Sequence, residues 1–326
     1  MLSLGKIDLM RRIRSVIKVK NLTRKFGAFT AVNSISFEIP RGQIVGLLGH
    51  NGAGKTTTLK MMTGFLEGTS GEVTIDGLDI NQHRLQIQSR IGYLPENSPL
   101  YPELTVVEYL QYVAQLRGIE PSQIPDAIRS AIAATDLKDK ATQNIETLSK
   151  GYKQRVGVAQ AILHKPDILI LDEPTNGLDP TQILAMRNLI TNLGKSATVI
   201  ISTHIMQEVE AICDRALIIL NGRLAEDTMI ADLKKGNALS LHLKEKPEVV
   251  EPMLRSISGV SAVHSAPRSE GLFSYNITLQ ADTPSLAPHL AKAVIDKGWD
   301  LFSLSQEQRD LETVFKEVNS QSKGAR

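Results

Sequence analysis

Eight residues, GHNGAGKT at 49–56, constrain this chain more than any other segment of its sequence. They match the pattern G-x-x-x-x-G-K-[S/T] and lie between an apolar run at 42–49 and a helical pattern that begins at Lys55. Glycines let backbone N–H groups of such a loop curve around phosphate oxygens, and the following helix points its positive end at the same anion. The segment therefore predicts a buried strand, a phosphate-binding loop and a helix.

The side chains of this loop predict a site for a nucleoside triphosphate and its Mg²⁺ ion. Lys55 is expected to reach the β- and γ-phosphates, Thr56 to ligate the ion, and Thr57 to donate to a nearer phosphate. A glycine-rich turn without a ligand is the alternative, and the strand before the loop and the helix after it argue against that alternative. The predicted nucleotide-binding residues of the loop are Gly49, Asn51, Gly52, Ala53, Gly54, Lys55, Thr56 and Thr57.

A second acidic segment, ILILDEP at 168–174, ends an apolar strand in two adjacent carboxylates. Neighbouring strand residues face opposite ways, so the two carboxylates are expected to do different work. Asp172 suits the surroundings of the Mg²⁺ ion, and Glu173 suits a general base that polarises the attacking water.

Further apolar runs at 167–171, 198–202 and 216–220 alternate with helical stretches. Such strands predict an α/β fold with a mostly parallel sheet that is covered on both faces. The segment 97–147 is predicted to be a mainly helical subdomain. A composition shift near residue 235 precedes a β-α-β-β-α-β pattern, which predicts a small ferredoxin-like domain. The expected domains are a basic N-terminal extension at 1–15, a nucleotide-binding domain at 16–235 and an accessory domain at 236–326.

The amino-acid composition limits the classes of protein to which the chain can belong. With 326 residues, of which 42% are hydrophobic, the chain is expected to form a folded core. With a net charge of +2, it lacks the strong overall positive charge that is typical of proteins that bind nucleic acid. Its one cysteine, Cys213, cannot form an intrachain disulfide and is expected to be a buried apolar residue. No apolar run approaches the roughly 18 residues that span a bilayer, so the chain is interpreted as cytoplasmic. The basic N-terminal segment is either a solvated end or a contact for anionic lipid.

The segment LSKGYKQR at 148–155 carries a resemblance to a known family. The sequence resembles the ATP-binding subunit of an ABC transporter, whose signature normally reads LSGGQ and here reads LSKGY. This resemblance implies that Ser149 and the helix amides near Gly151 bind the γ-phosphate of ATP held by a second subunit. Two ATP molecules would then be enclosed in a head-to-tail dimer, which is expected to be a homodimer.

The same resemblance assigns roles to three further residues. Phe26, in RKFGAF, matches the aromatic residue that stacks on adenine. Asp179, in NGLDP, matches a loop that communicates between the two sites of the dimer, and His204, in ISTH, matches a histidine that contacts the γ-phosphate. As isolated residues, all three would be read as ordinary surface or core positions.

Two departures from the family pattern affect the site. IGYLPENSPLY places Glu96 where the family usually has a glutamine, and this carboxylate is expected to ligate Mg²⁺ or to order water. Lys150 and Tyr152 replace the first glycine and the glutamine of the signature. The combination of YLPENSPLY and LSKGYKQRVGVAQAI is similar to the gliding-motility-associated branch of ABC ATPases, close to multidrug and polysaccharide exporters.

The C-terminal segment resembles accessory domains attached to such ATPases. DLETVFKEV at 310–318 matches their closing helix, and Trp299 and Phe302 are predicted to be core residues. No catalytic group is expected in this domain.

The resulting hypothesis is an ATPase subunit that dimerises on ATP and drives a separate membrane permease, which is expected to be an exporter. The subunit would lie at the cytoplasmic face of the membrane, and family resemblance places the permease contact at Pro99, Leu100 and Tyr101. One alternative is an ABC-type ATPase that acts on ribosomes or DNA. Another is a P-loop kinase or GTPase, which would need neither the LSKGYKQR helix nor Glu173.

Overall fold

The central sheet of the chain is built on the strand that leads into the phosphate-binding loop, as the sequence predicts. The computed structural model describes residues 15–234, 238–280, 286–307 and 310–324. The six strands of this sheet have the order β10-β9-β3-β8-β7-β6, in which β6 to β9 and β3 run parallel and β10 is antiparallel to β9. They are β3 (Ile44–Leu48), β6 (Ile91–Leu94), β7 (Ile168–Asp172), β8 (Thr198–Thr203), β9 (Arg215–Leu220) and β10 (Arg223–Met229).

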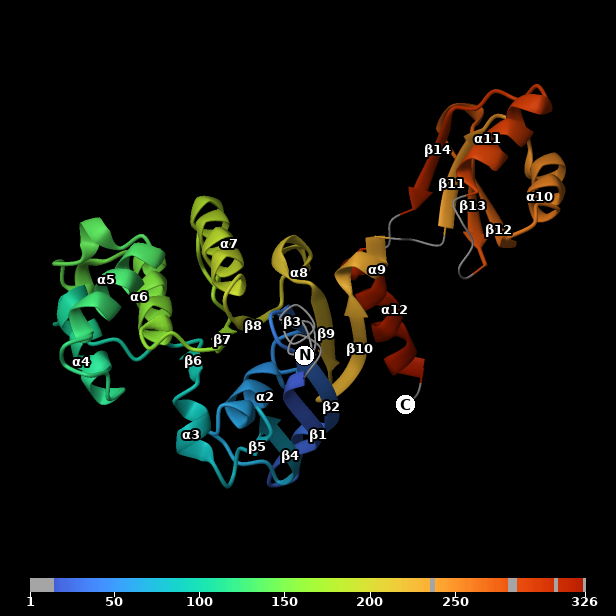
Figure 1. Cartoon of the computed structure of the whole chain (residues 1–326). Helices are drawn as coiled ribbons and strands as arrows, with labels where there is room; N and C mark the ends of the chain where they lie inside the picture. The colour runs from blue at the N-terminus through green and yellow to red at the C-terminus, as the bar shows by residue number, and fades with distance from the viewer. Residues whose placement is uncertain (1–14, 235–237, 281–285, 308–309, 325–326) are drawn as a thin grey trace, which may run out of the picture. The chain divides into compact units, whose positions relative to one another are not determined.

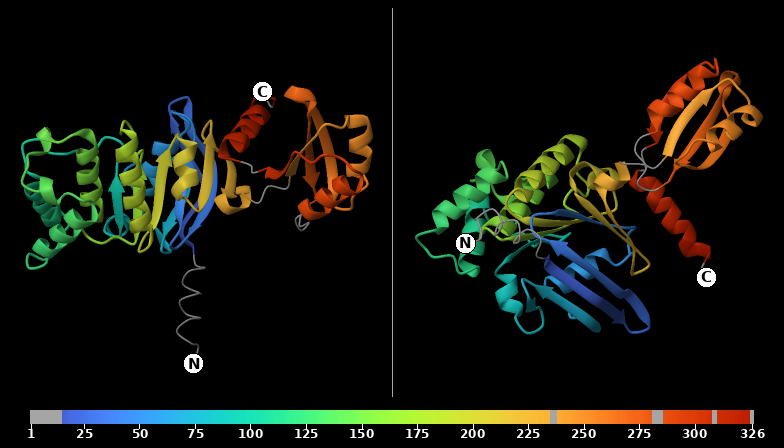
Figure 2. Two further views of the ribbon diagram at one scale, coloured as in Figure 1. Left: turned by 90° about the horizontal axis from the view of Figure 1, so that it is seen from above. Right: turned by 45° about the vertical axis from the view of Figure 1, so that its right-hand side comes forward.

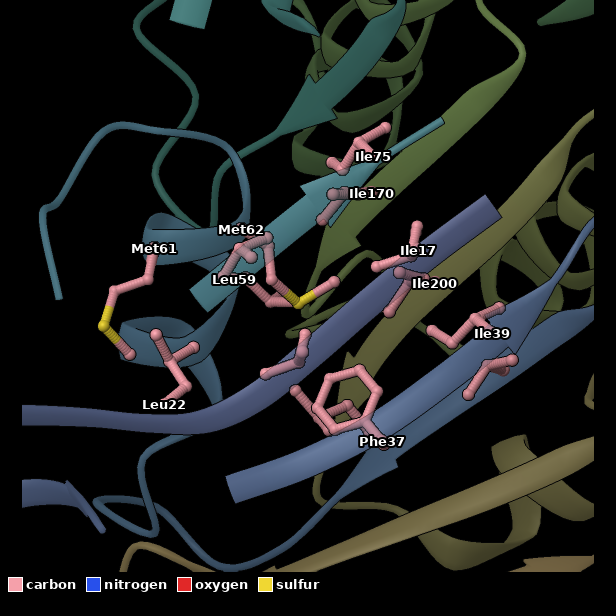
Figure 3. Close-up of a cluster of buried hydrophobic side chains, with 14 of the residues drawn as sticks. Ile17, Leu22, Phe37, Ile39, Leu59, Met61, Met62, Ile75, Ile170 and Ile200 are labelled. Carbon is pink, nitrogen blue, oxygen red and sulfur yellow. The ribbon is translucent and has the colours of Figure 1, made fainter. Parts of the chain in front are cut away.

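A second, antiparallel sheet and one helix cover one face of the central sheet. Helix α2 (Lys55–Met62) directs Leu59 and Met62 into a core that also holds Ile17 from the second sheet and Ile170 from the central sheet (Figure 3). The alternation of apolar and polar residues at 15–40 follows from burial of only one face of this sheet. Its strands, in the order β2-β1-β4-β5, are β1 (Ser15–Phe26), β2 (Phe29–Pro40), β4 (Ser70–Ile75) and β5 (Leu78–Asp79).

Helices cover the opposite face, so the predicted two-sided cover is confirmed. In β3, Val45 and Leu47 lie in the core shared with α2, whereas Gly46 faces the other way. A Cβ on Gly46 would lie 2.6 Å from Cγ1 of Val209, so the absence of a side chain lets a helix pack closely. The helices packed near this face are α7 (Pro180–Gly194) and α8 (Met206–Ile212), and Cys213 after α8 is buried as expected.

The helical subdomain stands at one end of this unit, away from the antiparallel sheet (Figures 1 and 2). Thr105 and Glu108 form a reciprocal capping box at the start of its first helix. Its core also includes Val156, Ala159 and Leu163, which lie beyond the predicted limit of 147, because the apolar face of the following helix packs against the two before it. The three helices are α4 (Val106–Leu116), α5 (Ile124–Ala134) and α6 (Lys150–Ile162), and α3 (Arg84–Gln88) precedes them.

A second compact unit, Ala231–Val314, begins within α9 (Ile230–Lys234). Its antiparallel sheet has the order β12-β13-β11-β14, so the predicted β-α-β-β-α-β arrangement is confirmed. Trp299 packs against its core as predicted, but the prediction for Phe302 is wrong. That ring is 49% exposed and lies under the Lys244 ammonium. The elements are β11 (Ala238–Leu243), α10 (Pro247–Arg255), β12 (Val260–Pro267), β13 (Phe273–Leu279), α11 (Ala287–Asp296) and β14 (Ser303–Glu307).

The closing helix α12 (Leu311–Gly324) is divided between the two units. From Phe315 onward its residues cluster with the first unit rather than with the second. The predicted accessory domain at 236–326 included these residues. The predicted extension at 1–15 lies outside the described residues except for Ser15, where β1 begins.

Candidate nucleotide site

The loop between β3 and α2 has the geometry of a phosphate-binding loop. Gly54 precedes the first residue of α2 with φ of 107°, a conformation that favours glycine. A Cβ at this position would also lie 2.6 Å from the Ala31 carbonyl oxygen. Gly54 is therefore required by both its conformation and the close approach of β2.

Lys55 begins α2 and places a cation inside the loop. Its side chain is only 5% exposed, and its Nζ donates to the carbonyl oxygens of Gly49 at 2.8 Å and His50 at 3.3 Å. The ammonium also lies 3.4 Å from Oε1 of Glu173, at the end of β7. The predicted lysine and one predicted carboxylate thus meet in the folded chain.

Asp172 lies behind the loop and is fully buried. Its Oδ1 accepts hydrogen bonds from the hydroxyls of Thr56, at 3.2 Å, and of Ser202 in β8. Its Oδ2 is buried and has no hydrogen-bond partner among the described residues. A carboxylate oxygen left open beside a threonine hydroxyl fits Mg²⁺, which takes few protein oxygens and completes its shell with water and phosphate.

Glu173 follows Asp172 and faces different partners, as the alternation of the strand predicts. Its Oε2 lies 3.0 Å from Nδ1 of His204, and its backbone N–H donates to the Ser202 hydroxyl at 3.0 Å. Its φ is 49°, which is unfavourable for a residue with a side chain and is held here by the surrounding contacts. Ser202 therefore binds the carboxylate of Asp172 and the backbone of Glu173, a role that the sequence prediction missed.

A buried carboxylate supports the two loops that carry Glu173 and His204. Glu208, at the start of α8, is 2% exposed and accepts hydrogen bonds from the hydroxyls of Thr175, at 2.7 Å, and Thr203, at 3.0 Å. Since Thr175 follows β7 and Thr203 ends β8, Glu208 ties together the ends of two neighbouring parallel strands. No sequence motif indicated this network.

A cavity of about 450 Å³ opens above the loop. Phe26 and Phe29, paired at the end of the β1–β2 hairpin, line it and are 47% and 63% exposed, and the Arg24 guanidinium lies 4.6 Å from the centre of the Phe26 ring. Phe26 was predicted and Phe29 was not, although both stand in RKFGAF. The cavity is lined by Phe26, Phe29, Ala31, Asn51, Gly52, Gly54, Lys55, Thr56, Thr57, Glu96 and Glu173.

Seven predicted site residues do not line this cavity, and four of them lie around it. Gly49 contributes the carbonyl that Lys55 binds, and Ala53 is buried. Asp172 lies behind Thr56, while His204 reaches the site through Glu173. These four residues shape the site from outside the cavity.

Tyr93, in β6, is a further residue that the sequence prediction missed. Burial, together with the negative charges of Asp172 and Glu96, raises the pKa of its phenol well above the usual range. The hydroxyl therefore stays protonated, and it has no partner in the described part of the chain. It is a buried donor at the edge of a carboxylate-rich site.

The residues of the LSKGY signature and of the Asp179 loop lie outside the cavity. Ser149 is the N-cap residue of α6, and a Cβ on Gly151 would lie 2.6 Å from the Gln182 side chain. Asp179 caps α7 by accepting a hydrogen bond from the Gln182 backbone N–H at 2.9 Å. The Lys150 side chain lies against Gly177 in the loop before Asp179. The signature and the Asp179 loop therefore form one surface, and none of these residues lines the cavity.

Several known proteins are similar to this chain in sequence or in fold. The family model described as "ABC transporter" matches residues 32–176. The chain is 33% identical over 308 residues to the uncharacterized ABC transporter ATP-binding protein YxlF of Bacillus subtilis (strain 168), covering 93% of this chain and 99% of that protein. It is 40% identical over 225 residues to the bacitracin transport ATP-binding protein BcrA of Bacillus licheniformis, covering 68% of this chain and 72% of BcrA.

A solved structure, that of cbiO1 from Clostridium perfringens, described as part of the ABC transporter complex cbiONQ, matches with a TM-score of 0.62 and 26% identity. The match covers 67% of this chain and 90% of that chain. Fold, loop and relatives together define the class: an α/β P-loop protein that binds and hydrolyses ATP. Within that class, the chain belongs to the family of ATP-binding subunits of ABC transporters.

The predicted resemblance is thereby confirmed at the level of the family, while its gliding-motility-associated branch stays a prediction. Among the described residues, no helix is both long enough and apolar enough to cross a membrane.

Proposed function

We propose that two copies of this subunit close around ATP, hydrolyse it and reopen, and so drive a separate membrane permease in the direction of export. In this proposal the subunit is bound at the cytoplasmic face of the membrane through the permease. The similarity to a bacitracin transport protein supports transport as the work done, and the export direction follows from the resemblance to exporters.

The observation that supports this proposal is that the predicted site residues lie on two separate surfaces of the chain. The loop, Glu173 and the two phenylalanines surround one cavity, but Ser149, Gly151 and Asp179 share another surface. A second copy could bring that surface to the open side of the cavity, so that each nucleotide is held by residues from both copies. A dimer that forms only with ATP follows, because the γ-phosphate would then be the shared ligand.

The pairing of Lys55 with Glu173 supports a sequence of events at the site. A buried cation stays paired, so phosphate oxygens that bind the Lys55 ammonium replace Glu173 as its partner. Glu173 is then free to accept the proton of the attacking water as general base. His204 holds the other carboxylate oxygen and keeps the base oriented.

The proposed metal ligands are Thr56 and Asp172 behind the loop and Glu96 in the cavity wall. When bound, Mg²⁺ would offset the negative charge of the phosphates. The carboxylate of Glu96 adds a negative charge that the usual glutamine would lack. The proposed nucleotide contacts are the cavity residues named above, with adenine stacked against Phe26.

The proposed permease contact follows the Glu96 loop. Tyr101 is 43% exposed, and its ring meets that of Tyr112, which is 40% exposed, at 5.4 Å between centroids. Two exposed aromatic rings in contact are typical of a protein-binding surface. With Pro99 and Leu100 they supply an apolar patch for a permease segment.

Replacement of Glu173 by glutamine tests the proposal. The variant keeps the size of the side chain but replaces one carboxylate oxygen by an NH2 group and cannot accept the proton, so phosphate release should fall at least about 100-fold. ATP should then hold the variant as a dimer, which size-exclusion chromatography with light scattering would detect. The matched control is Glu120→Gln, which changes an exposed glutamate of the helical subdomain in the same way.

Unchanged phosphate release by Glu173→Gln would remove Glu173 from the role of base. A monomeric variant with ATP bound would contradict the shared-nucleotide dimer.

A further inference from the structure

The closing helix brings an aromatic side chain to the phosphate-binding loop. Phe315, in α12, is 4% exposed and meets the imidazole of His50 edge to face, with ring centroids 4.8 Å apart and planes at 85°. His50 is the second residue of the loop, 265 positions earlier in the chain. Phe315 also belongs to the first compact unit, so this contact lies within that unit.

The backbone of His50 links this contact to the phosphate-binding lysine. The His50 carbonyl accepts hydrogen bonds from the Lys55 ammonium at 3.3 Å and from the Ala53 backbone N–H at 3.1 Å. A shift of His50 would therefore move one of the oxygens that orient the ammonium. No hydrogen bond holds the exposed imidazole of His50 among the described residues, so the Phe315 ring is its principal restraint.

The opposite side of the loop is held by the turn between β9 and β10. The backbone N–H of Gly222 donates to the Ala53 carbonyl at 2.9 Å. Strand β10 continues into α9, where the second unit begins, and α12 is the helix on which it ends. Of the two segments that connect the second unit to the first, α12 therefore contacts the loop directly, and the other begins with β10, which follows the turn that contacts the loop.

We propose that Phe315 is a positioning residue for nucleotide binding, which holds His50 so that the loop carbonyls keep the Lys55 ammonium in place for the nucleotide phosphates. Displacement of α12 then weakens nucleotide binding. Because the second unit ends within α12, a change in that unit that displaces the helix would alter the affinity for nucleotide. The inference rests on nucleotide binding by the loop and does not depend on the permease or on the proposed dimer.

The test is the dissociation constant for Mg·ADP, measured by calorimetry on the full chain. ADP reaches the loop through its β-phosphate and leaves the γ-phosphate contacts out. An edge-to-face aromatic pair corresponds to about a three- to tenfold change in affinity. Phe315→Ala and His50→Ala should each weaken ADP binding by about this factor, and the double variant should be no weaker than the weaker single variant. His50→Phe, which keeps a ring against Phe315, should bind like the unchanged chain.

Phe302→Ala is the matched control, because it removes an exposed aromatic ring from the second unit and should leave ADP affinity unchanged. Phe315→Leu keeps apolar volume in α12 and serves if the alanine variant does not fold. It should still weaken ADP binding, since the ring contact is lost. Unchanged affinity in Phe315→Leu and His50→Ala, or effects that multiply in the double variant, would overturn the inference. Neither result would affect the trapped dimer of Glu173→Gln, so the two proposals fail separately.

Discussion

Asp172 and Glu173 are neighbours in the sequence, yet their carboxylates contact different partners. Asp172 meets Thr56 and Ser202, whereas Glu173 meets Lys55 and His204. Strand alternation predicts this separation, but the positive φ of Glu173 comes from the tight exit of β7 and could not be read from the sequence. The strain is located at the proposed base.

His164, at the end of the helical subdomain, is a second residue whose chemistry depends on its surroundings. Its Nε2 lies 3.2 Å from the Ile91 carbonyl, and Arg117 donates to the same oxygen. Burial, and then the charge of Arg117, lower the pKa of His164 to about 4. The imidazole therefore stays neutral in the folded chain at pH values where the unfolded chain binds a proton.

This difference predicts a loss of stability in acid. Below the unfolded pKa of about 6.5 the unfolded state binds more protons, so the free energy of unfolding falls until the pH passes the folded value. At about pH 5, His164 lowers the free energy of unfolding by up to about 2 kcal/mol relative to neutral pH. His164→Gln should remove this part of the loss, as urea denaturation at neutral and acid pH would measure. The control is His83→Gln, on the surface; equal behaviour of both variants would contradict the assignment.

Helix α6 shows how one element serves two places. Its apolar face packs in the helical subdomain through Val156 and Ala159, while its N-terminus presents Ser149 and Gly151 beside Gln182 of α7. Ser149 occupies the N-cap position of this helix. Its side chain makes no capping hydrogen bond, so it is available to a ligand.

Ser149→Arg tests the role of this helix end. The long cation would obstruct a shared γ-phosphate, so the ATP-dependent dimer should be lost. Binding of ADP should stay within about twofold, since Ser149 does not line the cavity. Chromatography with ATP and calorimetry with ADP measure the two effects. Ser130→Arg, an exposed serine on α5, is the control; a Ser149→Arg variant that dimerises normally would favour a monomeric ATPase.

The whole molecule combines a nucleotide-binding unit with a ferredoxin-like unit, and YxlF aligns over 93% of the chain, which includes parts of both. No described helix can span a membrane. In the proposed function, a separate membrane permease completes the transport work.

Co-purification tests this partner. The Glu173→Gln chain, tagged and extracted from membranes in mild detergent with ATP, should carry a polytopic membrane protein in a stoichiometric amount. Tyr101→Arg in the same background should lose that protein, because a buried charge would oppose apolar docking. Mass spectrometry identifies and quantifies the partner. Ribosomal or DNA-bound partners without a membrane protein would contradict the permease proposal.

Local pattern was enough to predict much of this protein. The strand-loop-helix at 42–62, the carboxylates that end β7 and the order of elements in the second unit all followed from periodicity and motif, because each depends on residues close in sequence. Asn51, Lys55, Thr56 and Thr57 of the loop line one cavity together with Phe26 and Glu96. A short segment of sequence is enough to determine the backbone conformation on which these features depend.

Tertiary structure alone decided the rest. Ser202, in a neighbouring strand, binds the Asp172 carboxylate and the Glu173 backbone N–H. Glu208 joins two strand ends, and Phe315 reaches His50 from the last helix. Each is an ordinary residue in its local sequence, without a motif to mark it. Such contacts arise when parallel strands and a returning helix bring distant segments together, and pairing across a fold depends on packing rather than on the spacing of residues along the chain.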